Sequence, residues 1–218
     1  MEMIKINNFS KKYGDLSVYQ NFNLEIEEGK TTVILGESGS GKTTLINAIA
    51  SLIDYDGKIE GDIYPLSMVF SKNRLAENLT VEQNLKLVCP DIDVLPILKE
   101  VGLEGCKDDY PKSLSAGMAR RVSVARALLY PSKTLLMDEP LINLDVALKF
   151  SLMSMIKEKQ KKEGKTIIFV THDIKEAVYM GDRIIVLKGG RVIYDNSKIT
   201  KKTEEELFGL MISCGNEL

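Results

Sequence analysis

The 218-residue sequence has little of several features that would mark specialised classes of protein. Its 29 basic and 31 acidic side chains leave a net charge of -2, so it lacks the basic excess that nucleic-acid binding usually needs. No apolar run approaches the ~20 residues of a membrane-spanning helix, and the first residues contain no apolar secretory segment. These absences predict a soluble, cytosolic protein that does not bind nucleic acid.

Cysteine and histidine are also scarce. The three cysteines, Cys89, Cys106 and Cys214, are an odd number and widely spaced, without a C-x-x-C pair. We therefore expect reduced thiols, with neither a disulfide framework nor a metal site built on cysteine. The one histidine, His172, directly follows an apolar run at 166–170. A lone histidine is more often structural than functional, so its role depends on its neighbours.

What the sequence does contain is a succession of apolar runs that alternate with helical patterns. Segments 3–9 and 22–26 alternate apolar and polar residues, which predicts two-faced strands of a small antiparallel layer. The continuous apolar runs at 31–35, 134–137 and 166–170 predict buried strands of a mainly parallel sheet covered by helices. The fold class is therefore predicted to be α/β.

Between residues 72 and 130 the pattern changes from strands to helices. Thr80-Val81-Glu82-Gln83 has the form of a capping box that opens a helix, and residues 116–129 are apolar at helical spacing. We predict a single domain, 1–218, in which residues 1–71 and 131–218 form the α/β core with its β layer. Residues 72–130 are predicted to form an inserted helical lobe.

The run at 31–35 leads into a glycine-rich segment and then into a helix, in the spacing G-x-x-x-x-G-K-[ST] of a phosphate-binding loop. Its glycines let successive N–H groups point at one phosphate, while Lys42 would reach the β- and γ-phosphates and Thr43 would hold Mg²⁺. A glycine-rich turn with a chance Lys-Thr pair is the weaker alternative. The predicted core is thus a P-loop NTPase, and the predicted ATP-binding residues of this segment are Gly36, Glu37, Ser38, Gly39, Ser40, Gly41, Lys42, Thr43 and Thr44.

Two carboxylates, Asp138 and Glu139, follow the apolar run at 134–137. An Asp at the end of a buried strand can join the coordination sphere of Mg²⁺, and the Glu after it can act as general base on water. A helix-capping Asp-Glu-Pro turn is the commoner meaning of such residues. With the phosphate loop expected on a neighbouring strand, the catalytic interpretation is favoured. We expect His172 at the same edge, where ligands of open α/β sheets bind.

The segment Leu114-Ser115-Ala116-Gly117-Met118-Ala119-Arg120-Arg121, followed by Val124-Ala125-Arg126-Ala127-Leu128, resembles the signature sequence of ATP-binding cassette (ABC) ATPases, whose usual form is Leu-Ser-Gly-Gly-Gln. The chain departs from that form at Ala116 and Met118 and keeps Ser115 and Gly117. A serine hydroxyl at a helix N-terminus can form a second γ-phosphate site, although Leu-Ser-Ala-Gly alone would only be a helix start. In order with the phosphate loop, the two carboxylates and His172, the resemblance covers nearly the whole chain.

The resemblance implies an Mg²⁺-dependent ATPase with Glu139 and His172 as catalytic residues. It also implies that Tyr13 stacks on adenine, for which a surface tyrosine in a turn is the alternative. Two cassettes would pack head to tail, with ATP between the phosphate loop of one chain and Ser115, Ala116, Gly117 and Met118 of the other. Asp145 would lie in the D-loop at that interface.

One position leaves the family pattern. The family places a Gln after Val-Phe at the junction of sheet and helical lobe, where it contacts the metal. Here Val69-Phe70 is followed by Ser71, whose shorter side chain would approach a cation through water. We keep Ser71 as a candidate metal-site residue beside Thr43 and Asp138.

The resemblance further implies a peripheral subunit at the cytoplasmic face of the cell membrane, joined to an integral membrane permease. The chain is most similar to importer cassettes of the nitrate/sulfonate/taurine type, for which a solute-binding protein would be a further partner. Three alternatives remain: an exporter or lipoprotein-release cassette, a non-transport ABC protein, and a P-loop kinase. The kinase would have no use for Ser115, Gly117 and His172 in this order.

Overall fold

The computed structural model describes residues 2–215, with side chains through residue 212. The first strands form a three-stranded antiparallel sheet in the order β2-β1-β4, from β1 (Met3–Tyr13), β2 (Leu16–Glu27) and β4 (Asp56–Glu60). The predicted β layer is therefore confirmed. β1 continues through Tyr13, so only residues 14 and 15 separate it from β2.

The second sheet has six strands in the order β5-β6-β7-β3-β8-β9. Five of its strands run parallel, and β9 (Arg191–Asn196) pairs antiparallel with β8 (Arg183–Lys188) in a hairpin. The other strands are β3 (Thr31–Leu35), β5 (Leu66–Val69), β6 (Thr134–Asp138) and β7 (Thr166–Thr171). Every residue of β3, β6 and β7 is buried, as expected of parallel strands covered on both faces.

The order of these strands corrects one expectation. The phosphate-loop strand β3 and the strand β6, which ends at Asp138, are not neighbours, because β7 lies between them. The register nevertheless aligns their ends: Val170 of β7 pairs with Asp138 on one side and with Ile34 on the other. The three strand ends thus reach the same edge of the sheet.

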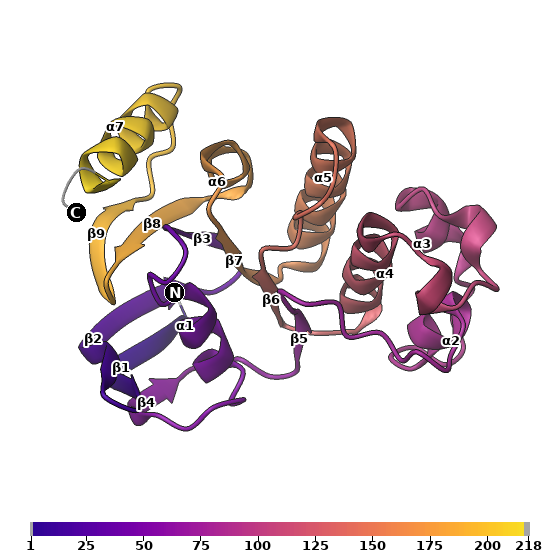
Figure 1. Ribbon diagram of the computed structural model, residues 1–218, viewed down its shortest axis with the longest axis horizontal. Helices are drawn as coiled ribbons and strands as arrows, with labels where there is room; N and C mark the ends of the chain where they lie inside the picture. The colour runs from indigo at the N-terminus through magenta and orange to yellow at the C-terminus, as the bar shows by residue number, and fades with distance from the viewer. Residues whose placement is uncertain (1, 216–218) are drawn as a thin grey trace.

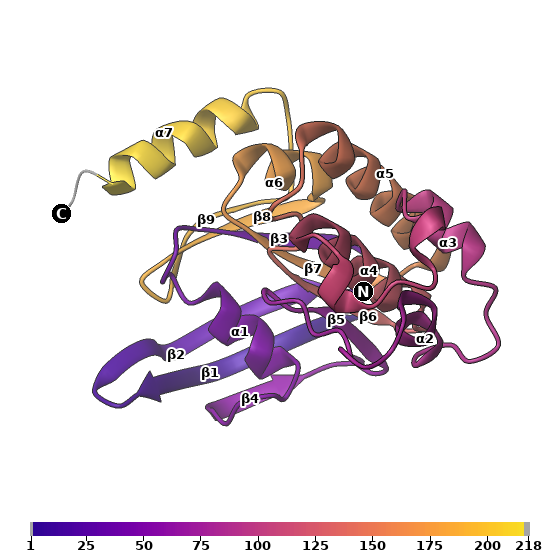
Figure 2. The ribbon, with the colours of Figure 1, turned by 45° about the vertical axis from the view of Figure 1, so that its right-hand side comes forward.

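Helices cover both faces of this sheet (Figures 1 and 2). α1 (Lys42–Ile49) packs between it and the β layer, where Leu45 and Ile49 share an apolar cluster with Ile34 of the sheet. α5 (Val146–Glu163) and α6 (Ile174–Met180) cover the opposite face, as Ile156 and Met180 show by packing in the cluster of Val33. α7 (Thr203–Gly215) follows β9.

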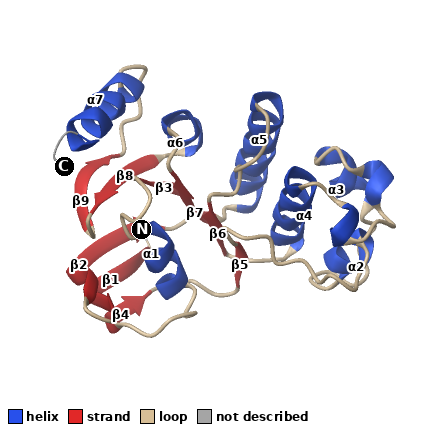
Figure 3. Cartoon of the chain, in the orientation of Figure 1, coloured by secondary structure: helices blue, strands red, loops and turns tan. Residues whose placement is uncertain are grey.

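Beyond β5 the chain enters a segment that is helical in the structure (Figure 3). Its elements are α2 (Val81–Lys86), α3 (Leu95–Glu100), α4 (Ala116–Leu129) and two short 3₁₀ helices, η1 (Glu104–Cys106) and η2 (Pro111–Ser113). The capping box is confirmed, since Thr80 and Gln83 exchange side chain-to-backbone hydrogen bonds of 3.3 and 2.9 Å. Leu85 and Val122 share a core with Val33 of β3, and the lobe boundaries at 72 and 130 stay a prediction.

Two further findings concern the remaining expectations. Cys89 and Cys106 are free thiols, while the side chain of Cys214 lies outside the described part of the structure. Within residues 2–215, no helix has both the length and the apolar character needed to cross a bilayer.

Candidate active site

The phosphate loop connects β3 to α1 in a backbone conformation that depends on glycine. Gly39 and Gly41 have φ values of 82° and 103°, in the left-handed region that glycine adopts at no steric cost. At Gly41 a Cβ atom would also lie 2.8 Å from the ring and hydroxyl of Tyr19. Tyr19 is buried beneath the loop, and its hydroxyl has no hydrogen-bond partner among the described residues. The phosphate loop therefore packs against the ring of Tyr19.

Lys42, the first residue of α1, folds back over this loop. Its Nζ donates hydrogen bonds of 2.7 Å to the carbonyls of Gly36 and Glu37. Burial lowers the pKa of Lys42, whereas the nearby carboxylates of Glu139 and Asp138 raise it. The ammonium is thus held over the loop by backbone carbonyls, in a position where phosphate oxygens would compete for it.

Thr43 and Asp138 meet across the sheet edge. The Thr43 hydroxyl donates to both carboxylate oxygens of Asp138, at 3.2 and 3.0 Å. Burial raises the pKa of the Asp138 carboxyl, and the hydroxyls of Thr43 and Ser71 act in the opposite direction as donors. Ser71, the third candidate residue of the metal site, is exposed.

These oxygens fit a magnesium ion. Mg²⁺ is usually held by one or two carboxylates together with phosphates of the substrate and water, and P-loop proteins add the hydroxyl of the loop. Thr43 and Asp138 supply such a pair in contact with each other. Among the described residues there is no group of three or more acidic, histidine or cysteine side chains that would hold a metal alone. A site completed by the phosphates is therefore the one that the residues support.

Glu139 and His172 lie together at the ends of adjacent strands. His172 Nδ1 is 3.2 Å from Glu139 Oε1, and the two side chains are 57% and 24% exposed. Glu139 has a φ of 47°, a left-handed conformation that is costly for a residue with a Cβ atom and occurs most often at functional sites. Its N–H donates to the carbonyl of Val170 at 2.9 Å, which holds the strained residue against β7. The predicted catalytic pair is thus in contact.

A pocket of about 340 Å³ joins the loop to the β layer. It brings together the predicted residues Tyr13 and Glu139, and it includes Leu16 and Val18 of β2, which were not predicted from the sequence. Alternation along β2 shows which residues share a face, but it does not show which loop that face meets. The lining residues are Tyr13, Leu16, Val18, Ser38, Gly39, Gly41, Lys42, Thr43, Thr44 and Glu139.

The signature residues do not line this pocket. Ser115 is the N-cap of α4, and its hydroxyl accepts from the N–H of Met118 at 3.2 Å, while Ala116 and Ser115 are exposed. A Cβ atom at Gly117 would lie 3.1 Å from the carbonyl of Asn143, so a larger residue there would require this neighbour to shift by a few tenths of an ångström. Asp145 caps α5 by accepting from the N–H of Leu148 at 3.0 Å.

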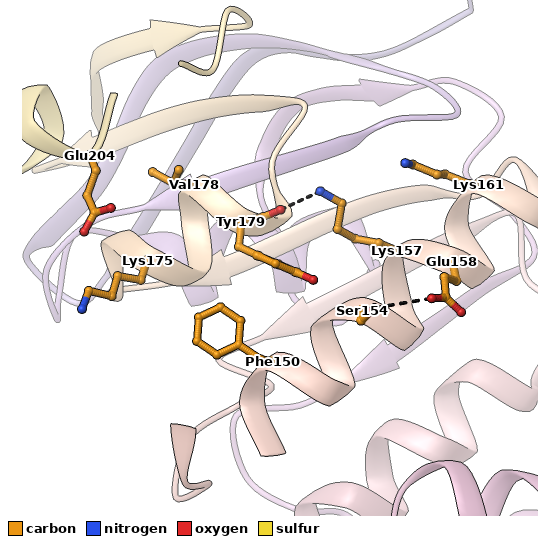
Figure 4. A pocket seen from close by; sticks show the side chains of 9 residues that line it. All are labelled: Phe150, Ser154, Lys157, Glu158, Lys161, Lys175, Val178, Tyr179 and Glu204. Carbon is orange, nitrogen blue, oxygen red and sulfur yellow. Dashed lines mark hydrogen bonds between the residues drawn. The ribbon is translucent and has the colours of Figure 1, made fainter. Parts of the chain in front are cut away.

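A larger hollow, of about 640 Å³, lies away from these groups between α5, α6 and the start of α7 (Figure 4). Lys157 there donates to the carbonyl of Tyr179 at 2.6 Å, and Phe150 packs edge-on against the Tyr179 ring. Neither the phosphate loop nor the Asp138–Glu139 carboxylates reach it. The smaller pocket beside the loop is therefore the candidate active site.

The model of the ABC transporter family matches residues 19–142, more than half of the chain. The chain belongs to the ABC transporter family. It is an ATP-binding cassette of that family, an ATPase, and its α/β architecture is that of solved cassettes. The resemblance that the motifs carried is thereby confirmed.

Several curated relatives are import proteins. The chain is 38% identical over 209 residues to the Fe(3+) ions import ATP-binding protein FbpC of Fusobacterium nucleatum, covering 87% of this chain and 56% of the relative. It is 37% identical over 194 residues to the aliphatic sulfonates import ATP-binding protein SsuB 2 of Paraburkholderia xenovorans, covering 87% and 78%. The chain thus spans little more than half of the iron-import relative and most of the sulfonate-import one.

Solved cassettes share the fold and similar dimensions. The dimeric cassette MJ0796, in a post-hydrolysis state bound to ADP and Pi, superposes with a TM-score of 0.78 at 31% identity, covering 88% of this chain and 97% of that chain. An ATP-binding subunit of an ABC transporter gives a TM-score of 0.81 at 25% identity over 96% and 94%.

Proposed function

We propose that this ABC cassette hydrolyses ATP at the edge formed by β3, β6 and β7, and that it drives solute import through a separate membrane permease. The observation that carries the site assignment is the meeting of two contacts at one edge: Thr43 with Asp138, and Glu139 with His172. The pocket beside the loop is open toward Tyr13, which we assign to stacking on the adenine.

Glu139 is the group that we assign to the attacking water. As a carboxylate it can accept a proton from that water, and it lies beside the loop that holds the phosphates. His172, 3.2 Å from it, is placed to hold the Glu139 side chain and to donate to the γ-phosphate. When bound, Mg²⁺ neutralises charge on the β- and γ-oxygens. Thr43 and Asp138 are the residues that would hold it, with Ser71 nearby.

Lys42 and the loop amides stabilise the phosphate charge. In the ligand-free conformation the Lys42 ammonium is held by the carbonyls of Gly36 and Glu37. Phosphate oxygens would replace those carbonyls as acceptors, since charge-assisted hydrogen bonds are stronger than neutral ones. The helix N-terminus of α1 adds further attraction.

The second half of the site comes from a second copy of the chain, in this proposal. Ser115 and Asp145 are exposed, although in the described structure they cap only their own helices. Val146, beside Asp145, is an apolar side chain that is 69% exposed, and Leu16 is exposed at the mouth of the nucleotide pocket. Apolar residues exposed beside the proposed active site suit a surface that closes on a partner.

The names of the relatives support our proposal of import, of a permease partner and of a place at the cytoplasmic face of the membrane. FbpC, SsuB and PotA are named as import ATP-binding proteins for iron, sulfonates and spermidine or putrescine. A solute-binding protein would complete such an importer.

The test is hydrolysis by the purified chain. We expect ATP turnover that requires Mg²⁺ and rises more than linearly with protein concentration, because the competent species is a dimer. Turnover proportional to protein concentration down to a dilution where the chain is monomeric would contradict the shared site. Co-purification with a tagged membrane protein from the same genome neighbourhood tests the transporter assignment separately.

A further inference from the structure

Arg120, in the second turn of α4, holds the backbone that leaves the sheet. Its two terminal nitrogens donate to two consecutive carbonyls, those of Phe70 and Ser71. Arg120 is only 2% exposed, and a planar guanidinium with two acceptors fixes both in one geometry. The side chain therefore joins the helix that begins after Ser115 to the segment that follows β5.

The carboxylates of the candidate active site act electrostatically on the same guanidinium. Burial lowers the pKa of Arg120, whereas the negative charges of Asp138 and Glu139 raise it. The hydroxyl of Ser71, on the backbone that Arg120 holds, acts on Asp138 as a hydrogen-bond donor. The backbone that Arg120 holds thus carries the hydroxyl that acts on Asp138.

The next residue of the helix, Arg121, provides a comparison. It donates to the consecutive carbonyls of Val101 and Gly102, at 2.8 and 3.1 Å. Those acceptors follow α3, within the same helical segment as α4. Both arginines secure the packing of α4, but only Arg120 of this pair binds the backbone that directly follows β5.

We propose that Arg120 is a positioning residue that couples the position of the signature helix α4 to the geometry of the Asp138 site. The inference rests on the proposed ATPase function and gives a role to a residue to which that function assigns none. When Ser115 binds a phosphate held by a second chain, α4 is displaced. The hydrogen bonds of Arg120 to the carbonyls of Phe70 and Ser71 then move the backbone at 70–71 with the helix. Hydrogen-bond networks of this kind can carry energetic coupling between two sites.

The kinetic test compares Arg120→Gln with Arg121→Gln as the matched control. We expect Arg120→Gln to lower kcat for ATP hydrolysis about ten-fold with KM within about three-fold, and Arg121→Gln to keep both within about two-fold. Arg120→Lys keeps the charge with a single donor centre, so it should recover part of the lost kcat. Equal kcat values for the two Gln variants would overturn the inference.

A second measurement does not depend on turnover. Spin labels at the exposed positions Leu52, after α1, and Leu95, at the start of α3, report the distance between the sheet and the helical segment, with the three native cysteines replaced by serine. We expect one narrow distance distribution in the wild-type and Arg121→Gln chains and a broader one in Arg120→Gln. Equal widths in all three would overturn the inference.

The two measurements also separate this inference from the proposed function. A wild-type chain without Mg²⁺-dependent turnover contradicts the proposed function, and the label distances then decide on Arg120. If Arg120→Gln fails to fold, Arg120→Lys carries both measurements, with smaller changes expected in the same direction.

Discussion

The proposed active site has two halves, one at the phosphate loop and one at the signature residues. A single chain assembles the contacts of the first half but not those of the second. At the loop half, Lys42, Thr43, Asp138, Glu139 and His172 already lie within contact of one another or of the loop backbone. At the signature half, the polar groups of the helix start are used only to cap α4 and α5. The strand ends of one chain are enough to form the loop half. The signature half is an exposed surface that would act only in contact with a second chain.

The largest effect is expected at the loop half, from Glu139→Gln. The amide cannot take a proton from water, so turnover should fall by at least about 100-fold, the scale of a lost general base. ATP should still bind, and dimers should accumulate on gel filtration because closure is no longer followed by hydrolysis. Unchanged hydrolysis would remove Glu139 from the role of base.

A smaller but still large effect is expected from His172→Ala. His172 contacts Glu139 and is more than half exposed, so its removal should lower turnover about 10- to 100-fold and change ATP affinity only a few-fold. Parallel measurement of kcat and of nucleotide binding by titration separates the two quantities. Normal turnover would reduce His172 to a structural residue.

The junction between the halves should respond mildly to Ser71→Gln. A longer side chain at this exposed position can reach the Asp138 site directly, so basal ATPase activity should stay the same or rise by up to about three-fold. Lys72→Gln, at the next exposed position, is the matched control and should have no effect. A collapse of activity in Ser71→Gln alone would mean that the chain depends on the serine hydroxyl itself.

The smallest expected effect is a change in stability on substitution of Tyr19, which packs beneath the phosphate loop. The hydroxyl of Tyr19 is buried without a partner, so Tyr19→Phe should raise the free energy of unfolding by about 1 kcal/mol. Urea denaturation measures this change. Tyr64→Phe is the control, because the exposed Tyr64 hydroxyl has a partner in Ser51 at 3.1 Å and its loss should be neutral or slightly destabilising. A loss of stability in Tyr19→Phe would show that its hydroxyl has a partner, such as a buried water.

The sequence predicted the loop half well because its parts are local. A phosphate loop between strand and helix, and acids or a histidine directly after buried strands, are placed at one sheet edge by the geometry of parallel strands. The order of the strands was harder, since nothing in the apolar runs specifies that β7 separates β3 from β6. The extent of β1 was also harder, since the strand continues past the alternation at 3–9 and ends at Tyr13, which lines the pocket beside the loop.

The contact of Arg120 with the backbone at 70–71 could not be predicted from the sequence. Its acceptors, Phe70 and Ser71, lie 50 and 49 residues earlier in the chain. The pattern of charges along α4 cannot show which of its arginines binds the backbone that follows β5. The contact depends on the packing of α4 against β5, which only the three-dimensional structure reveals.

The measurement that tests the central account most directly is complementation between two inactive chains. Lys42→Ala removes the loop half and Ser115→Arg blocks the signature half, so neither homodimer should hydrolyse ATP. In a mixed head-to-tail dimer one of the two sites combines both intact halves, so an equal mixture should recover about a quarter of wild-type turnover. A mixture no more active than its separate components would contradict a site shared between two chains.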